Sequence, residues 1–158
     1  MFSWPKGGLK PSKRSEVISS VDLFPTVLAA AGARIPDNTP GMNLLESLQR
    51  KTAITRTGIF GEGFAHDIAD IKKPEASLLY RWRIEGKWKL LLTYDGEVNR
   101  YKRSHPRTEK RPQLFDLSSD PHEKNNLAKH HPKIVADLAA KIAAWWPVRE
   151  RKVLTTFE

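Results

Sequence analysis

The segment from residue 78 to residue 92 constrains the fold more than any other part of the sequence. Its apolar residues alternate with basic ones on either side of Gly86, which is the pattern of two antiparallel strands joined by a tight turn. A three-residue loop at residues 84–86, with Gly86 left-handed, predicts three apolar cross-strand pairs: Trp82 with Trp88, Tyr80 with Leu90, and Leu78 with Leu92. The opposite face would then pair Arg81 with Lys89 and Arg83 with Lys87. We therefore expect an antiparallel hairpin with one apolar face.

Two other segments have the spacing of amphipathic helices. In the first, Asp22 is expected to cap the helix, Pro25 lies in the first turn and Gly32 ends it, with an apolar stripe formed by Phe24, Val27, Leu28 and Ala31. In the second, Pro132 opens the helix and Pro147 ends it, with Ile134, Leu138, Ile142 and Trp145 on one face. This last helix should pack against the sheet face that carries Trp82, Trp88 and Leu90.

Shorter elements complete the prediction. Phe2 and Trp4 precede a Pro-Lys-Gly-Gly turn, which is typical of a strand end. A helical turn is expected at residues 44–48, strands at 57–64 and 113–117, an irregular segment at 65–74 and a basic loop at 95–112. The pattern predicts an α+β fold.

Composition narrows the possible functions without choosing among them. The 158 residues carry a formal net charge of +9, which favours anionic partners, and they include no cysteine. Disulfides, thiolate metal sites and a cysteine nucleophile within this chain are therefore excluded. No segment has the pattern of a signal peptide or a membrane span.

Candidate site residues are few. Glu62, His66 and Asp67 lie at a strand end bounded by glycines, where side chains can reach a cleft. The other histidines are expected to serve turns and helix entries, because none has metal-ligand spacing. Motifs for a serine nucleophile, a phosphate loop or a metal site are missing, so we assign no catalytic and no metal-binding residue. Nucleic-acid binding is not expected, because Tyr101 is the only aromatic residue in the basic loop.

Four segments, in order, resemble the carboxyl-terminal half of sulfatases of the alkaline-phosphatase-like superfamily. They are residues 4–11, residues 20–32 with the sequence SVDLFPTVLAAAG, residues 81–91 with RWRIEGKWKLL, and residues 114–128 with LFDLSSDPHEKNNLA. Between them, Gly41-Met42-Asn43-Leu44-Leu45 resembles the family's G-x-x-L-L turn. The long basic loop before Leu114 and the tail beyond Trp146 depart from the family pattern.

The resemblance implies hydrolysis of sulfate esters or sulfamates on a sulfated small molecule or polysaccharide, with a formylglycine and a calcium ion. In the family these groups lie before the Trp-Pro segment, so they are expected in the amino-terminal part of a parent enzyme and not in this chain. Residues 1–50 would be the last strand and helix of the large α/β domain, and residues 51–158 the antiparallel-sheet subdomain with its closing helix. The resemblance makes Glu62 and His66 candidates for substrate contact at the cleft rim. Family members usually work in the periplasm or outside the cell.

Two alternatives remain open from the sequence. The chain could be a free-standing basic module that binds an anionic glycan or a nucleic acid. It could also belong to a phosphoester hydrolase of the same superfamily, since such enzymes share the scaffold and differ upstream.

Overall fold

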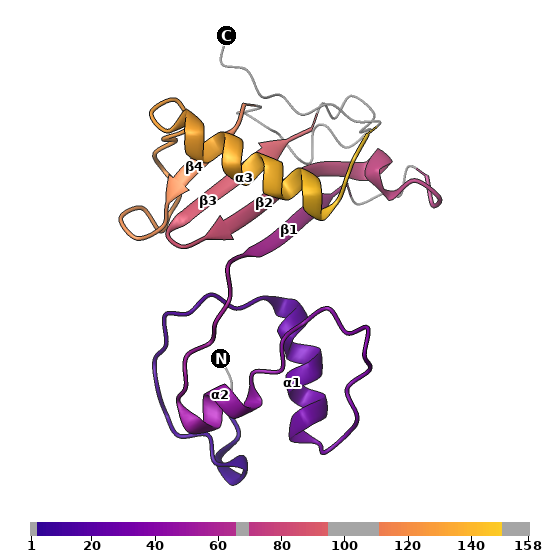
Figure 1. The fold of residues 1–158 in the computed structure, drawn as a ribbon, viewed down its shortest axis with the longest axis vertical. Helices are drawn as coiled ribbons and strands as arrows, with labels where there is room; N and C mark the ends of the chain where they lie inside the picture. Colours follow the sequence, from indigo (N-terminus) through magenta and orange to yellow (C-terminus); the bar gives the residue numbers. More distant parts are fainter. Residues whose placement is uncertain (1–2, 66–69, 95–110, 150–158) are drawn as a thin grey trace. The chain divides into compact units, whose positions relative to one another are not determined.

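The computed structural model describes residues 3–65, 70–94 and 111–149, and the chain divides into two compact units, residues 1–59 and 60–158 (Figure 1). In chain order the elements are η1 (Pro5–Gly7), η2 (Ser20–Asp22), α1 (Leu23–Ala30), α2 (Leu45–Arg50), β1 (Ile59–Phe64), η3 (Pro74–Ser77), β2 (Leu78–Glu85), β3 (Trp88–Thr93), β4 (Gln113–Asp116) and α3 (Pro132–Trp145). No helix in the described ranges has the length and apolar character needed to cross a bilayer.

The first unit is built from short helices and the loops that join them. No strand occurs among residues 3–58, so the predicted strand end is not found at Trp4, and Phe2 lies outside the described residues. The Trp4 carbonyl accepts hydrogen bonds from the amides of Gly7 and Leu9, and Gly8 closes the turn with a φ of 83°. A tight turn replaces the strand because Pro5 has no N–H for a ladder and its fixed φ suits a helical turn.

The helix predicted after Asp22 is confirmed as α1, and the turn at residues 44–48 is confirmed within α2. Pro25 lies in the first turn of α1, and Gly32 has a φ of 68°, the left-handed conformation expected where a helix stops. α1 and α2 pack against each other within this unit.

The second unit is a four-stranded sheet with the order β1-β2-β3-β4. β2 and β3 form the predicted hairpin, but the expected pairing is wrong. Glu85 lies opposite Trp88, so the turn contains only two residues, and Trp82 lies opposite Leu91 instead of Trp88. Gly86 is left-handed as predicted, with a φ of 55°.

This register also removes the like-charge pairs expected on the sheet. Arg81 lies opposite Leu92, and Arg83 lies opposite Leu90. Both arginines are buried on the face that carries the leucines. The prediction failed because it assumed that charged residues face water, whereas α3 and Glu85 supply partners that allow these guanidinium groups to be buried.

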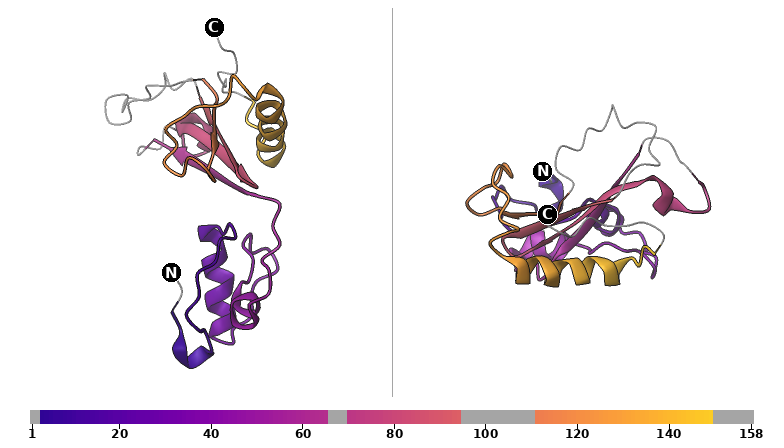
Figure 2. Two further views of the ribbon diagram at one scale, coloured as in Figure 1. Left: turned by 90° about the vertical axis from the view of Figure 1, so that its left-hand side faces the viewer. Right: turned by 90° about the horizontal axis from the view of Figure 1, so that it is seen from above.

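α3 lies across one face of the sheet (Figure 2). The buried core between them consists of Leu90, Leu92, Leu114, Ala128, Leu138 and Ile142, with Trp88 partly buried at its edge. The predicted contributions of Trp88 and Leu90 are confirmed. That of Trp82 is wrong, because its ring lies against Gly61 on the opposite face, where the shift in register has placed it.

Candidate functional site

The structure describes only one of the two residues predicted to contact the substrate. Glu62 lies on β1, which is an edge strand of the sheet, and its side chain is exposed. Gly61 and Gly63 on either side of it lie against the rings of Trp82 and Tyr80, so Glu62 projects from the other side of the strand. His66 and Asp67 lie outside the described residues. Of these three residues, the structure therefore gives a position only for Glu62.

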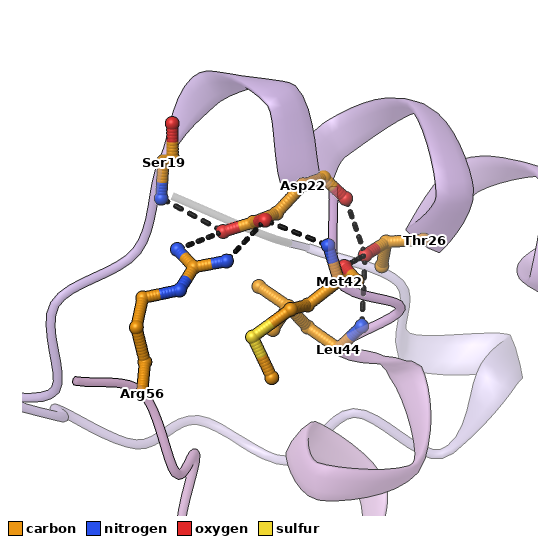
Figure 3. Close-up of polar contacts among 6 residues, drawn as sticks. All are labelled: Ser19, Asp22, Thr26, Met42, Leu44 and Arg56. Carbon is orange, nitrogen blue, oxygen red and sulfur yellow. Dashed lines mark hydrogen bonds and ion pairs between the residues drawn. The ribbon is translucent and has the colours of Figure 1, made fainter. Parts of the chain in front are cut away.

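The carboxylate of Asp22 is fully buried at the centre of a polar network in the first unit (Figure 3). Both of its oxygens accept two hydrogen bonds. Oδ2 accepts from the Ser19 amide at 2.8 Å and from Arg56 Nη1 at 2.7 Å, and Oδ1 accepts from the Met42 amide at 2.8 Å and from Arg56 Nη2 at 2.6 Å. This is the planar two-point geometry in which a guanidinium binds a carboxylate most strongly.

These contacts correct the predicted role of Asp22. Its side chain makes no capping bond to α1. It accepts a hydrogen bond from the Ser19 amide at the start of η2 and reaches across to two segments that are distant in the sequence. Burial raises the pKa of Asp22, but Arg56 and the backbone donors outweigh it and lower the pKa below its usual value. The carboxylate is therefore charged at neutral pH and joins three parts of the chain.

Thr26 continues this network one turn along α1. Its hydroxyl donates to the carbonyl of Asp22 at 2.6 Å and accepts from the amide of Leu44 at 3.0 Å. Gly41 lies so close to the carbonyl of Val21 that a side chain there would collide with the backbone. The network gives the G-x-x-L-L segment a physical explanation, because its backbone docks on Asp22 and Thr26 at a position where only glycine allows the approach.

Arg56 was missed by the sequence analysis. It stands in the segment Thr55-Arg56-Thr57, where nothing distinguishes it from a solvated arginine. Only the fold brings it to Asp22, 34 residues earlier. Knowing that Asp22 is buried would indicate that a cation compensates its charge. It would not indicate which cation in the sequence does so.

A second buried cation, Arg81, ties the sheet to the end of α3. Its Nη1 donates to the carbonyl of Ile142 at 3.1 Å and to the carbonyl of Trp146. The guanidinium lies 5.2 Å from the ring centroid of Tyr94 and 5.7 Å from that of Trp146. Carbonyls at the carboxyl end of a helix attract a cation, so Arg81 acts as a structural cap and not as a ligand site.

The contacts of residues 120–128 are those of a turn that covers the β4 edge. Asp120 accepts from the Asn125 amide at 2.7 Å, and this bond lowers its pKa. Asn126 accepts from the Leu114 amide at 3.0 Å and donates to the Pro112 carbonyl at 3.1 Å. The side chain of Asn126 thus supplies hydrogen bonds that a further strand would have made.

The donor groups placed by the structure do not fit a calcium site. Within residues 3–65, 70–94 and 111–149, no group of three or more His, Asp or Glu side chains is positioned to hold a metal ion. The buried carboxylate of Asp22 is already engaged by four donors, so it has no free direction for a cation.

No family model matches this chain, but individual proteins match it over most of its length. The N-acetylgalactosamine-6-O-sulfatase of Bacteroides thetaiotaomicron is 29% identical over 139 residues, which cover 86% of this chain and 24% of that protein. Arylsulfatase K of Xenopus laevis is 33% identical over 131 residues, covering 81% of this chain and 22% of that protein. The chain thus spans about a quarter of the length of these relatives.

Solved structures agree with the sequence matches. A structure from a study of glycosaminoglycan metabolism by Bacteroides thetaiotaomicron superposes with a TM-score of 0.50 and 26% identity, covering 78% of this chain and 24% of that one. A second structure, solved with its substrate D-glucosamine-2-N,6-O-disulfate, superposes with a TM-score of 0.54 and 20% identity, covering 78% of this chain and 23% of that one. At that identity the second match shows the fold alone.

Proposed function

Because the chain belongs to the sulfatase family, as a carboxyl-terminal part, we propose that it completes a hydrolase of sulfate esters or sulfamates on a sulfated carbohydrate. The observation that carries the proposal is the extent of the match, which covers 86% of this chain but 24% of a relative named for a sulfated sugar. The formylglycine and the calcium ion of the reaction would belong to polypeptide outside the matched segment.

The role proposed for this chain is structural support and part of the cleft rim. We assign residues 1–50 to the end of the large α/β domain and residues 51–158 to the sheet subdomain. The Asp22 network would hold the helix of the first part, and the sheet packed by α3 would carry the strand β1 that ends near the rim. Glu62 and His66 are proposed to contact the substrate there, since an exposed carboxylate and an imidazole can both bind sugar hydroxyls.

A chimeric enzyme tests the proposal. The matched segment of the Bacteroides thetaiotaomicron N-acetylgalactosamine-6-O-sulfatase would be replaced by this chain, and sulfate release from a 6-O-sulfated N-acetylgalactosamine substrate measured. We expect desulfation by the chimera and none by the isolated chain. Sulfate release by the purified 158-residue chain at an enzymatic rate would contradict the proposal.

The rim residues are tested in the same chimera. Glu62→Gln and His66→Ala should raise KM about tenfold with little change in kcat, because a contact at the rim binds the ground state and the transition state alike. Glu46→Gln is the matched control, since Glu46 is an exposed carboxylate on α2 that pairs with Arg50. Unchanged kinetics in both rim variants would remove these residues from the site.

A further inference from the structure

Two columns of stacked side chains stand where the carboxyl end of α3 lies over β1 (Figure 1). In the first column, the guanidinium carbon of Arg83 lies 4.3 Å from the ring centroid of Phe60. The indole of Trp145 is stacked on the same phenyl ring, with centroids 4.7 Å apart and planes within 7° of parallel. Arg83 and Trp145 therefore take opposite faces of Phe60. The column runs from a buried arginine to a tryptophan that is 42% exposed.

The second column is built in the same way. The guanidinium carbon of Arg81 lies 5.7 Å from the ring centroid of Trp146, and the ring of Phe64 lies 6.1 Å from that of Trp146 at an angle of 46°. Arg81 is buried, whereas Phe64 is 39% exposed. Each column thus begins at a buried cation and ends at an aromatic ring in contact with solvent.

Hydrogen bonds hold both columns at their buried ends. Arg83 Nε donates to Glu85 at 2.7 Å, and Glu85 also accepts from Lys141 of α3 at 2.7 Å. Arg81 donates to two carbonyls at the end of α3. Side chains that are already fixed lose little freedom when a ligand packs on them, so the entropy cost of binding is low. The exposed rings are therefore preorganised as a binding surface.

Glu62 stands between the two columns. It lies on β1 between Phe60 and Phe64, and alternate residues of a strand share a face, so all three side chains leave the sheet on the side of α3. Each phenylalanine is about 7 Å from Glu62 along the strand. Among the described residues, the carboxylate of Glu62 has no ion-pair partner. It is an available hydrogen-bond acceptor beside two exposed aromatic rings.

This combination of groups suits a sugar. A pyranose ring has C–H groups on its faces and hydroxyls around its edge, so it can bury a face on an aromatic ring while a hydroxyl donates to a carboxylate. A cation is a poorer ligand, because each column already holds a guanidinium against its aromatic rings. A sulfate group would be repelled by the charge of Glu62. The chemistry favours an uncharged sugar ring.

We propose that Trp145, Phe64 and Glu62 form a carbohydrate subsite that binds an unsulfated sugar ring, with a C–H face on the indole and hydroxyls on Glu62. The proposal rests on the function proposed above in one respect, since it extends the rim contact of Glu62 to the ring next to the one that loses sulfate. The subsite would make the rim select oligosaccharides over single sugars.

Binding of methyl N-acetylgalactosaminide to the full 158-residue chain tests the subsite without any catalysis. Saturation-transfer NMR measures the affinity and shows which sugar protons lie against the protein. We expect a Kd on the order of 1 mM, with the strongest transfer to the protons of one ring face. Trp145→Ala should weaken binding at least about tenfold, and Glu62→Ala about threefold. Trp145→Phe should keep most of the affinity, because it keeps a ring on Phe60.

The matched control is Trp4→Ala, since Trp4 is 36% exposed and belongs to the other unit. It should bind the sugar like the wild-type chain, and far-UV circular dichroism should show the variants folded alike. Absence of sugar binding by the wild-type chain would overturn the proposal, as would equal binding by Trp145→Ala. Tighter binding of tetramethylammonium than of the sugar, lost in Trp145→Ala, would overturn the assignment of the ligand. If Trp145→Ala does not fold, Glu62→Ala with unchanged affinity would overturn the proposal.

The chimeric enzyme separates this subsite from the proposed activity. There, Trp145→Ala should raise KM about tenfold for a sulfated oligosaccharide and leave KM for a sulfated monosaccharide unchanged. Sulfate release with both KM values unchanged would overturn the subsite and support the activity. Sugar binding through Trp145 in a chimera that releases no sulfate would support the subsite and contradict the activity.

Discussion

At the scale of the residue, a fully buried charge, the carboxylate of Asp22, links the parts of the first unit. The carboxylate of Asp22 is stabilised by four donors, two of them from one guanidinium, and the network connects η2, the loop before α2 and the segment before β1. Removing one partner of a buried ion pair leaves the other without compensation, which costs far more than the pair contributes by itself.

Asp22→Asn should therefore destabilise the first unit by about 3 kcal/mol, because Arg56 would keep its charge but lose its carboxylate. The exposed pair of Arg34 and Asp37 is the natural control, and Asp37→Asn should change stability by less than about 0.5 kcal/mol. Urea unfolding followed by the circular dichroism of the helices measures both. Equal effects of the two substitutions would show that burial of Asp22 does not decide its contribution.

The lowered pKa of Asp116 predicts that the stability of the second unit depends on pH. Lys87 and the hydroxyl of Ser118 hold the pKa of Asp116 at about 2, below its ordinary value of 3.8. A lowered folded-state pKa means that the stabilisation is fully present above the unfolded-state pKa and is lost as the pH falls toward about 2. The difference in melting temperature between the wild-type chain and Asp116→Asn should thus shrink between about pH 5 and about pH 2. A difference that grows with acidity would contradict the assignment.

At the scale of the element, glycines on β1 decide how closely aromatic rings of β2 can lie over the strand. A side chain at Gly61 would collide with the ring of Trp82. Gly61→Ala should cost about 1–3 kcal/mol, because the ring would have to leave its position. In a Trp82→Leu background the same change should cost less, and a double-mutant cycle measures the difference. Additive costs would place the strain elsewhere.

Which elements form was largely predictable, since the helices and strands follow from spacing that is local to each segment. α3 begins at Pro132 and ends before Pro147, as expected, and β4 lies at the predicted residues. The hairpin register was not predictable, because pairing hydrophobic residues assumes that arginines face water. Arg81 and Arg83 contradict that assumption only because the carbonyls of α3 and the carboxylate of Glu85 accept their hydrogen bonds on the core face.

At the scale of the whole molecule, the exposed apolar surface on α1 has a consequence for the isolated chain. Several large apolar side chains around the start of α1 are exposed together, namely Ile18, Val21, Leu23, Phe24 and Val27. Exposed apolar side chains in such numbers promote association. We expect the purified chain to be poorly soluble or to associate into heterogeneous species, as measured by light scattering at increasing concentration. A monodisperse monomer that melts cooperatively would count against its being part of a larger domain.

The sequence by itself determined the class of the fold, the order of its elements and the resemblance to sulfatases, because these depend on local periodicity, turn residues and short motifs. It also singled out Glu62 and His66, of which the structure describes only Glu62, exposed on an edge strand. Tertiary structure alone decided the partners of the buried charges, the face of the sheet that Trp82 occupies and the side of α1 that is exposed to solvent. Those outcomes depend on contacts between residues far apart in the chain, and no local pattern specifies which distant group will compensate a buried charge.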